Sequence, residues 1–415
     1  MDPISAKERV QLLDVLRGFA IFGMFTVNMT ADLLWGESFR EIDLPTPDLL
    51  ALIFVDFFTN GKFITIFSFL FGIGFFVQME RAGQRGGSQT LFYLRRSLGL
   101  LLIGVGAMSM HLLSWILIDY AIFGLALLLF YKRSSRVILI AVVSCFVVAK
   151  IFGSIIPDVR EHTELQVLAA EQGVSVAEVV QPADPVDEAR ETAFREGSFG
   201  EISAALLGNA WESFSDFHYY LGELDLLALL LLGLYAGQRG AVWDADARRS
   251  IARKTLPWLL TIGLSGMLIS GAMLHFDVGE KGSLSHTITW KLAAWPFGMP
   301  MLGLGYAAAI TLLIERETWE KILTPFAAVG RMALTNYLFT NLVIAIVSFP
   351  WALGLYDKLM PLTGLIIVVL VYPFQVFASR WWLRRFQFGP VEYLWRAFTY
   401  GHLPPMRQQA ANALE

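Results

Sequence analysis

Apolar runs of roughly 20 residues recur along the whole chain, and this recurrence limits the fold more than any other feature. A bilayer core is about 30 Å thick, so a helix needs roughly 20 mostly apolar residues to cross it. The alternating short-strand pattern of an outer-membrane barrel is absent. The sequence therefore predicts an all-α, polytopic transmembrane helical bundle of about ten spanning helices. The predicted spans are residues 11–34, 61–79, 92–113, 115–131, 137–156, 219–238, 255–275, 290–314, 326–348 and 361–382.

Composition supports this interpretation. Charged residues make up 16% of the 415 residues, whereas soluble domains carry about 25%. Cys145, the single cysteine, lies in an apolar run and is expected to pack in the interior. The sequence has no P-loop, dinucleotide fingerprint or metal motif, so we expect no metal cofactor and no nucleic-acid partner. The first apolar run carries Asp14 and Arg17 and is too long for a cleavable signal peptide.

The connections between the spans alternate in charge. Basic residues precede the first predicted span and follow the second, fourth and sixth, whereas the connections after the first and third carry at most one Lys or Arg. The positive-inside rule therefore predicts that both termini are cytoplasmic.

The one long connection, residues 157–218, carries thirteen acidic and three basic residues and is expected on the extracytoplasmic side. It separates an N-terminal membrane half, 1–156, from a C-terminal membrane half, 219–415, and a short charged helix could form near 186–195. This acidic loop could act as a lid or as a solvated spacer, and both interpretations stay open.

Three polar residues interrupt the first span. Asp14 and Arg17 are three residues apart, and Asn28 follows Arg17 by eleven, so all three share one helix face. A charge inside a membrane helix costs roughly 2.5–3.5 kcal/mol, so these groups should face protein or a wet cavity. The stripe is predicted to bind substrate, and the alternative is an ion pair at the headgroup level that sets orientation.

Histidine is the usual proton-transfer group near neutral pH. His111 ends the third predicted span, and Asp119 and Tyr120 lie in the fourth. A tight turn near Ser114 would bring the imidazole and the carboxylate together. We predict His111 as general base and Asp119 as the group that orients it, with Tyr120 beside them to bind substrate. The alternative is an interfacial histidine and an aspartate bonded to another helix.

Further polar residues are candidates for substrate binding. Lys62 opens the second span and could bind an anionic group or reach the headgroups. Arg331 could pair with Asp14 or bind a phosphate, and Asn336 and Tyr337 follow it on the same predicted helix.

Three stretches resemble the YeiB-like family of bacterial inner-membrane proteins, whose domain of unknown function occupies the C-terminal half. The N-terminal match is LDVLRGFA at residues 13–20, and the C-terminal matches are GRMALTNY at 330–337 and WLRRFQFGPVEYLWRAFTYG at 382–401. This resemblance implies a multi-pass protein of the bacterial inner (plasma) membrane.

The N-terminal half also resembles the transmembrane acyltransferase superfamily, which includes heparan-α-glucosaminide N-acetyltransferase. This resemblance implies transfer of an acyl group from cytoplasmic acyl-CoA, as co-substrate, to a hydroxyl of a cell-envelope glycan or lipid. The O-antigen acetyltransferases of that group carry a histidine eleven residues after the arginine of the first helix, where this chain has Asn28. An asparagine side chain cannot act as a general base. We therefore predict that His111, oriented by Asp119, takes the role of the histidine that this chain lacks at position 28.

Two other functions stay open: a transporter or lipid exporter that uses the same polar cavity, and a protein that binds a membrane lipid without turnover. The tryptophans of the C-terminal half would fit an interfacial belt as well as a homodimer contact; they include Trp351, Trp381, Trp382 and Trp395.

Overall fold

The computed structural model describes residues 11–30, 45–84, 88–174, 185–240, 243–275, 288–289 and 291–407. Across these ranges the chain is helical and forms no β-strand. Eight of the described helices are long and apolar enough to cross a membrane, or nine if one sharply bent pair counts as a single span. The prediction of an all-α polytopic transmembrane bundle is therefore confirmed.

The predicted spans all overlap observed helices, and the short helix expected before the second span is also present. The helices are α1 (Gln11–Thr30), α2 (Thr46–Phe58), α3 (Lys62–Gln84), α4 (Gln89–Ser109), α5 (Trp115–Phe130), α6 (Ser135–Lys150), α7 (Ile156–Gln172), α8 (Pro185–Glu196), α9 (Phe199–Ser215), α10 (Phe217–Gly222), α11 (Leu224–Gln238), α12 (Ala245–His275), α14 (Met299–Leu313), α15 (Glu317–Arg331), α16 (Ala333–Ser348), α17 (Pro361–Leu383) and α18 (Pro390–Tyr400).

The predicted span 326–348 overlaps two helices rather than one, because the chain bends by 87° between α15 and α16. Met332 lies between them with φ −113° and ψ 39°, outside the helical region. The first N–H groups of a helix have no partner within it. Here the Glu392 carboxylate of α18 accepts hydrogen bonds from the backbone N–H groups of Leu334 (2.6 Å) and Thr335 (3.0 Å). A distant side chain therefore stabilises the start of α16.

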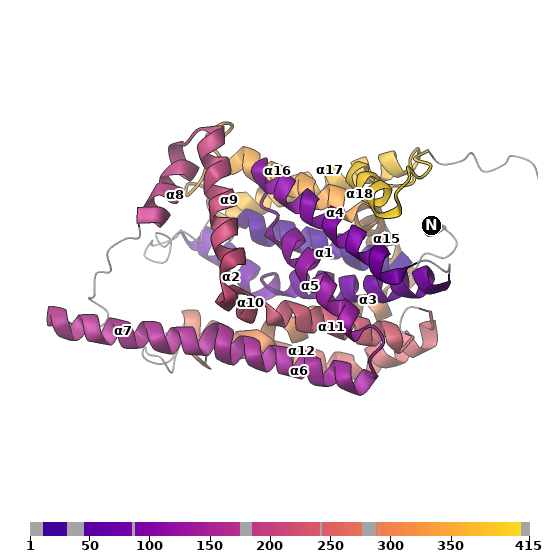
Figure 1. The fold of residues 1–415 in the computed structure, drawn as a ribbon, viewed down its shortest axis with the longest axis horizontal. Helices are drawn as coiled ribbons and strands as arrows, with labels where there is room; N and C mark the ends of the chain where they lie inside the picture. Colours follow the sequence, from indigo (N-terminus) through magenta and orange to yellow (C-terminus); the bar gives the residue numbers. More distant parts are fainter. Residues whose placement is uncertain are drawn as a thin grey trace, which may run out of the picture.

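The predicted acidic loop is mostly helical. α6 continues through a π-helical turn, Ile151–Ile155, into α7, and the two form one apolar-to-polar helix of 38 residues. Helices α8, α9 and α10 follow, with α8 at the position predicted for a short charged helix. Figure 1 shows α7 running past the bundle at the left, with α8 and α9 at that same end.

Two helix crossings bring backbones into direct contact. α1 packs on α15, and a Cβ added at Gly330 would lie 1.8 Å from the Asp14 carbonyl oxygen. A Cβ added at Gly18 would lie 2.0 Å from the Phe326 carbonyl oxygen. α3 and α11 cross in the same way at Gly72 and Gly233. Small residues at such crossings let membrane helices approach closely.

The ends of α5 and α11 and the start of α4, which adjoin basic residues, lie at one end of the bundle, on the right in Figure 1. Gln238, at the end of α11, donates to the carbonyl oxygens of Tyr131 and Arg133 after α5. Arg249 of α12 pairs with Glu315, which follows α14, at 3.1 Å. α18 reaches the start of α4 at this end, through a Trp395 hydrogen bond to the Arg96 carbonyl oxygen.

Candidate functional site

A cavity of about 210 Å³ lies between the two membrane halves. Its wall comes from α1, α3, α4 and α5 on one side and from α15, α16 and α18 on the other. Five arginines and two carboxylates line it, together with apolar and aromatic side chains. We call the five arginines the arginine cluster; they are Arg17, Arg81, Arg96, Arg331 and Arg396.

The α1–α15 crossing positions two members of the arginine cluster. Arg331 is the last residue of α15 and follows Gly330, whose contact with the Asp14 backbone brings it against α1. Arg17 donates to the Asp14 carboxylate at 3.0 Å. The Arg17 side chain is 30% exposed to solvent, whereas the Asp14 side chain is 5% exposed. Arg17 can therefore contact a ligand in the cavity while Asp14 holds the guanidinium in position.

α18 and its neighbours position the rest of the cluster. The Arg96 guanidinium lies 3.8 Å from the centroid of the Trp395 ring, and Arg396 lies 4.5 Å from that of Phe388. Arg81 lies over Trp243. Cation–π contacts of this kind hold a guanidinium while leaving its N–H groups directed elsewhere. Five guanidiniums against two carboxylates give the cavity a positive charge that suits an anion.

The remaining wall is apolar. It includes Met24, Leu70, Ile116 and Leu117, and Tyr120 completes it. The Tyr120 hydroxyl shares a 2.9 Å hydrogen bond with Ser68, and its ring stacks on those of Phe67 and Phe71. The cavity is thus charged on one side and apolar on the other, which suits an amphiphilic ligand.

The structure brings five of the predicted substrate-binding residues to this cavity. They are Asp14, Arg17, Tyr120, Arg331 and Tyr337. The expectation that Arg331 could pair with Asp14 requires the first helix to meet the C-terminal half, and α1 packs on α15 and α16.

Three other predicted residues do not line it. Lys62 is fully buried, and its ammonium donates to the Asp56 carbonyl oxygen at 2.7 Å. Asn336 donates to the Met332 carbonyl oxygen and to Ser379, so its amide supports the bend before α16. Asn28 lies three turns beyond Arg17, on the far part of α1.

The predicted pairing of His111 with Asp119 is wrong, because each side chain has other partners. The Trp351 indole N–H donates to Nδ1 of His111 at 2.8 Å. Nε2 must then carry the proton, and it lies 2.9 Å from Ser203 Oγ and 3.0 Å from the Phe199 carbonyl oxygen. Asp119 accepts instead from the Tyr219 hydroxyl, at 2.9 Å.

His111 acts as a structural link in this arrangement. Its ring is fully buried against Phe199, and its backbone has φ +63° in the turn between α4 and α5. Burial lowers the pKa of His111, which favours the neutral imidazole. The ring joins α9 to the segment after α16 through Ser203 and Trp351.

Comparison with known proteins decides the family. A family model described as "Protein of unknown function (DUF418)" matches residues 236–402. "Uncharacterized protein YxaH" of Bacillus subtilis (strain 168) is 30% identical over 421 residues, which cover 99% of this chain and 98% of that relative. The chain belongs to the YeiB-like DUF418 family. "Uncharacterized protein YeiB" of Escherichia coli (strain K12) is 28% identical over 42% of this chain and 60% of its own length.

The matched DUF418 segment supplies only part of the cavity. Arg331, Tyr337, Glu392 and Arg396 lie inside it, whereas Arg17 and the α3–α5 residues precede it. Among the described residues, no group of three or more His, Cys, Asp or Glu could hold a metal ion.

Sequence reasoning missed several cavity residues. Arg81 and Arg96 belong to the basic residues that follow the second predicted span and indicate orientation, and both also line the cavity. Glu392, Trp395 and Arg396 lie in the C-terminal stretch that carries the family resemblance, which was the one available signal.

Proposed function

We propose that this DUF418 protein is a membrane-bound acyltransferase that takes its acyl group from acyl-CoA. The observation that carries the proposal is the arginine cluster beside an apolar wall in one cavity. Coenzyme A bears several phosphate groups, and guanidiniums bind phosphate through paired, charge-assisted hydrogen bonds. The thioester-linked acyl chain would lie along the apolar wall near Tyr120.

The size of the cavity decides which part of the ligand enters. Its volume of about 210 Å³ is below the roughly 300–1,000 Å³ of sites that enclose a whole drug-sized ligand. We therefore propose that the acyl thioester and part of the pantetheine arm enter, while the nucleotide stays outside near Arg96 and Arg396. These two residues lie at the basic end of the bundle, which the positive-inside rule assigns to the cytoplasm. Acyl-CoA is available on that side.

The position of His111 makes its proposed role as general base testable. It lies beyond the end of α4, and the part of α4 from Arg96 to Ser109 alone is about 20 Å long. To act as a base it would have to release the Trp351 hydrogen bond, and the acyl group would have to reach it. Under this proposal His111→Ala abolishes transfer to an envelope hydroxyl, and unchanged turnover would remove His111 from the mechanism.

One observation favours a second function, which is lipid export or binding without chemistry. Along the described part of the chain, the carboxylates of Asp14 and Glu392 both accept hydrogen bonds from protein groups, and no histidine lines the cavity. A ligand that passes through such a site leaves unchanged. The two functions differ in whether a thioester is consumed.

Titration of the purified protein in mild detergent tests the proposal. We expect saturable binding of acetyl-CoA, with S-acetylpantetheine, which lacks the phosphates, binding more weakly. Replacing Arg331 or Arg396 with Gln should weaken acetyl-CoA binding about tenfold each, because a hydrogen bond to a charged group contributes roughly 1.5–3 kcal/mol. Arg385→Gln is the control, since Arg385 lies over Trp381 and does not line the cavity.

Equal affinity for the two thioesters, or no saturable binding, would refute the acyl-CoA site. A labelled acyl group that appears on an envelope glycan or lipid would favour transfer, whereas a lipid recovered unchanged with no consumption of thioester would favour export.

A further inference from the structure

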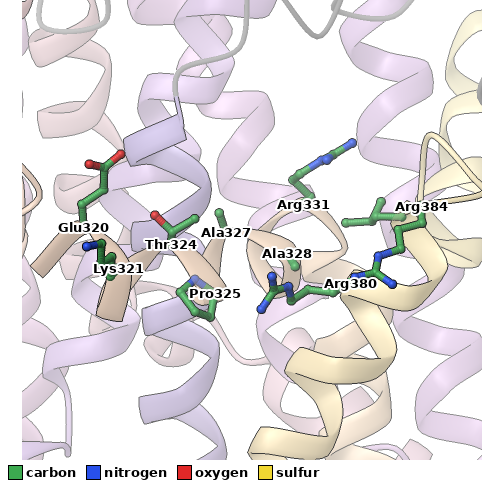
Figure 2. Close-up of a pocket in the computed structure, with 10 residues that line it drawn as sticks. Glu320, Lys321, Thr324, Pro325, Ala327, Ala328, Arg331, Arg380 and Arg384 are labelled. Atoms are coloured by element: carbon green, nitrogen blue, oxygen red, sulfur yellow. The ribbon is translucent and has the colours of Figure 1, made fainter. Parts of the chain in front are cut away.

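A second concave site lies between α15 and the end of α17, and we call it the α15–α17 groove. Its volume is about 550 Å³, and it is more open than the central cavity. Figure 2 shows Lys321 and Thr324 on one side, Arg380 and Arg384 on the other, and Ala328 between them. The remaining lining residues are Glu320, Pro325, Ala327, Arg331 and Leu383.

The groove is strongly basic. Four basic side chains line it against the single carboxylate of Glu320. Lys321 also pairs with Glu317 at 2.6 Å. Arg380 lies in the last turn of α17, and Arg384 follows four residues later as the C-cap of that helix, so the two lie on one side of the helix end, and both are exposed. Within the described ranges, neither guanidinium has an ion pair or a hydrogen bond with another residue. Two neighbouring guanidiniums of this kind suit a phosphate.

The surroundings of the groove are apolar and exposed. Phe377 and Trp381 of α17 are 68% and 45% exposed, and Ile322 of α15 is 53% exposed. α17 is a candidate membrane span, so its outward face meets acyl chains, and tryptophan near a basic helix end is typical of the membrane interface. An anion bound here would have lipid chains directly beside it.

We propose that the α15–α17 groove binds the headgroup of an anionic phospholipid. The phosphate lies between Arg380 and Arg384, with Lys321 across the groove, and the acyl chains follow α17 past Phe377. This site is separate from the acyl-CoA cavity, because Arg380 and Arg384 do not line that cavity. Arg331 lines both and is left unchanged in the test.

The test is native mass spectrometry of the full chain after incubation with equal amounts of phosphatidylglycerol and phosphatidylcholine. The wild type should retain phosphatidylglycerol in preference to phosphatidylcholine. The double variant Arg380→Gln/Arg384→Gln should retain at least tenfold less, and the single variants should be intermediate. Arg385→Gln removes the same charge from the next position on the chain and should behave as wild type. Inorganic phosphate at millimolar concentration should displace little lipid.

Undiminished retention of phosphatidylglycerol by the double variant would overturn the proposal, as would equal retention of both lipids. Full displacement by inorganic phosphate would assign the groove to a free anion and overturn it too. Acetyl-CoA titration of the double variant tests whether the two sites are separate. Unchanged affinity for acetyl-CoA supports a distinct lipid site. Loss of that affinity would mean that the groove and the cavity form one site, which would overturn the proposal. If Arg331→Gln and Arg396→Gln leave acetyl-CoA binding unchanged while the double variant loses lipid, the proposed function fails and the lipid site stands.

Discussion

The contact of Gly330 with α1 predicts a large effect of one methyl group. A Cβ at this position would lie 1.8 Å from the Asp14 carbonyl oxygen and 2.7 Å from the Gly18 nitrogen. Ordinary contact begins near 3.4 Å, so α1 and α15 would have to separate by about 1.6 Å. Both neighbours are backbone atoms inside helices, so no side-chain rotation relieves the clash.

Gly330→Ala should therefore destabilise the protein. Overpacking costs about 1–3 kcal/mol, and we expect the upper part of that range because only backbone can move. Alanine recovers up to about 1 kcal/mol through its better helix propensity. The net loss should lower the midpoint of thermal unfolding in detergent, measured by tryptophan fluorescence.

Gly106→Ala is the matched control for this measurement. Gly106 lies inside α4, and a Cβ there would have no heavy atom within 4 Å. The substitution should leave stability unchanged or raise it by about 0.5–1 kcal/mol. A Gly330→Ala protein as stable as the Gly106→Ala protein would refute the direct backbone contact between α1 and α15.

Two further predictions concern groups outside the membrane spans. Because burial lowers the pKa of His111, the unfolded chain takes up a proton near pH 6.5 while the folded chain does not, so this contribution to stability is present above that pH and lost as the pH falls. The fall in unfolding midpoint from pH 7 to 5 should be smaller in His111→Gln than in the wild type; parallel curves of the two proteins would contradict this. Glu392→Ala removes the acceptor for two N–H groups at the start of α16 and should cost about 1–3 kcal/mol, with Glu392→Gln less affected, both read from the unfolding midpoint.

Sequence patterns predicted the helices well because hydropathy alone sets the length of a membrane span. The same signal could not predict the bend at Met332, since the run from 326 to 348 is mostly apolar on both sides of it, with Arg331 as its single charge. The bend depends on Glu392, some sixty residues further along the chain, whose carboxylate accepts a hydrogen bond from the Leu334 N–H at the start of α16. No local window contains that information.

The candidate site shows the same limit. Helical spacing predicts one polar stripe of Asp14, Arg17 and Asn28, and the first two line the cavity whereas Asn28 does not. The chemistry of imidazole points to His111, but the ring accepts a hydrogen bond from Trp351, 240 residues away. Spacing predicts which residues share a helix face, whereas the choice of partner depends on tertiary packing.

Two short stretches far apart in the chain form one crossing. Gly18 follows Arg17 directly, and Gly330 precedes Arg331, so each glycine that allows close approach adjoins an arginine of the cavity. A chain that keeps both arginines but loses either glycine should therefore lose stability and acetyl-CoA binding together. A chain that keeps both glycines but loses Arg331 should lose binding alone. Unfolding midpoints and titrations on the same variants thus separate the packing of this crossing from its charge.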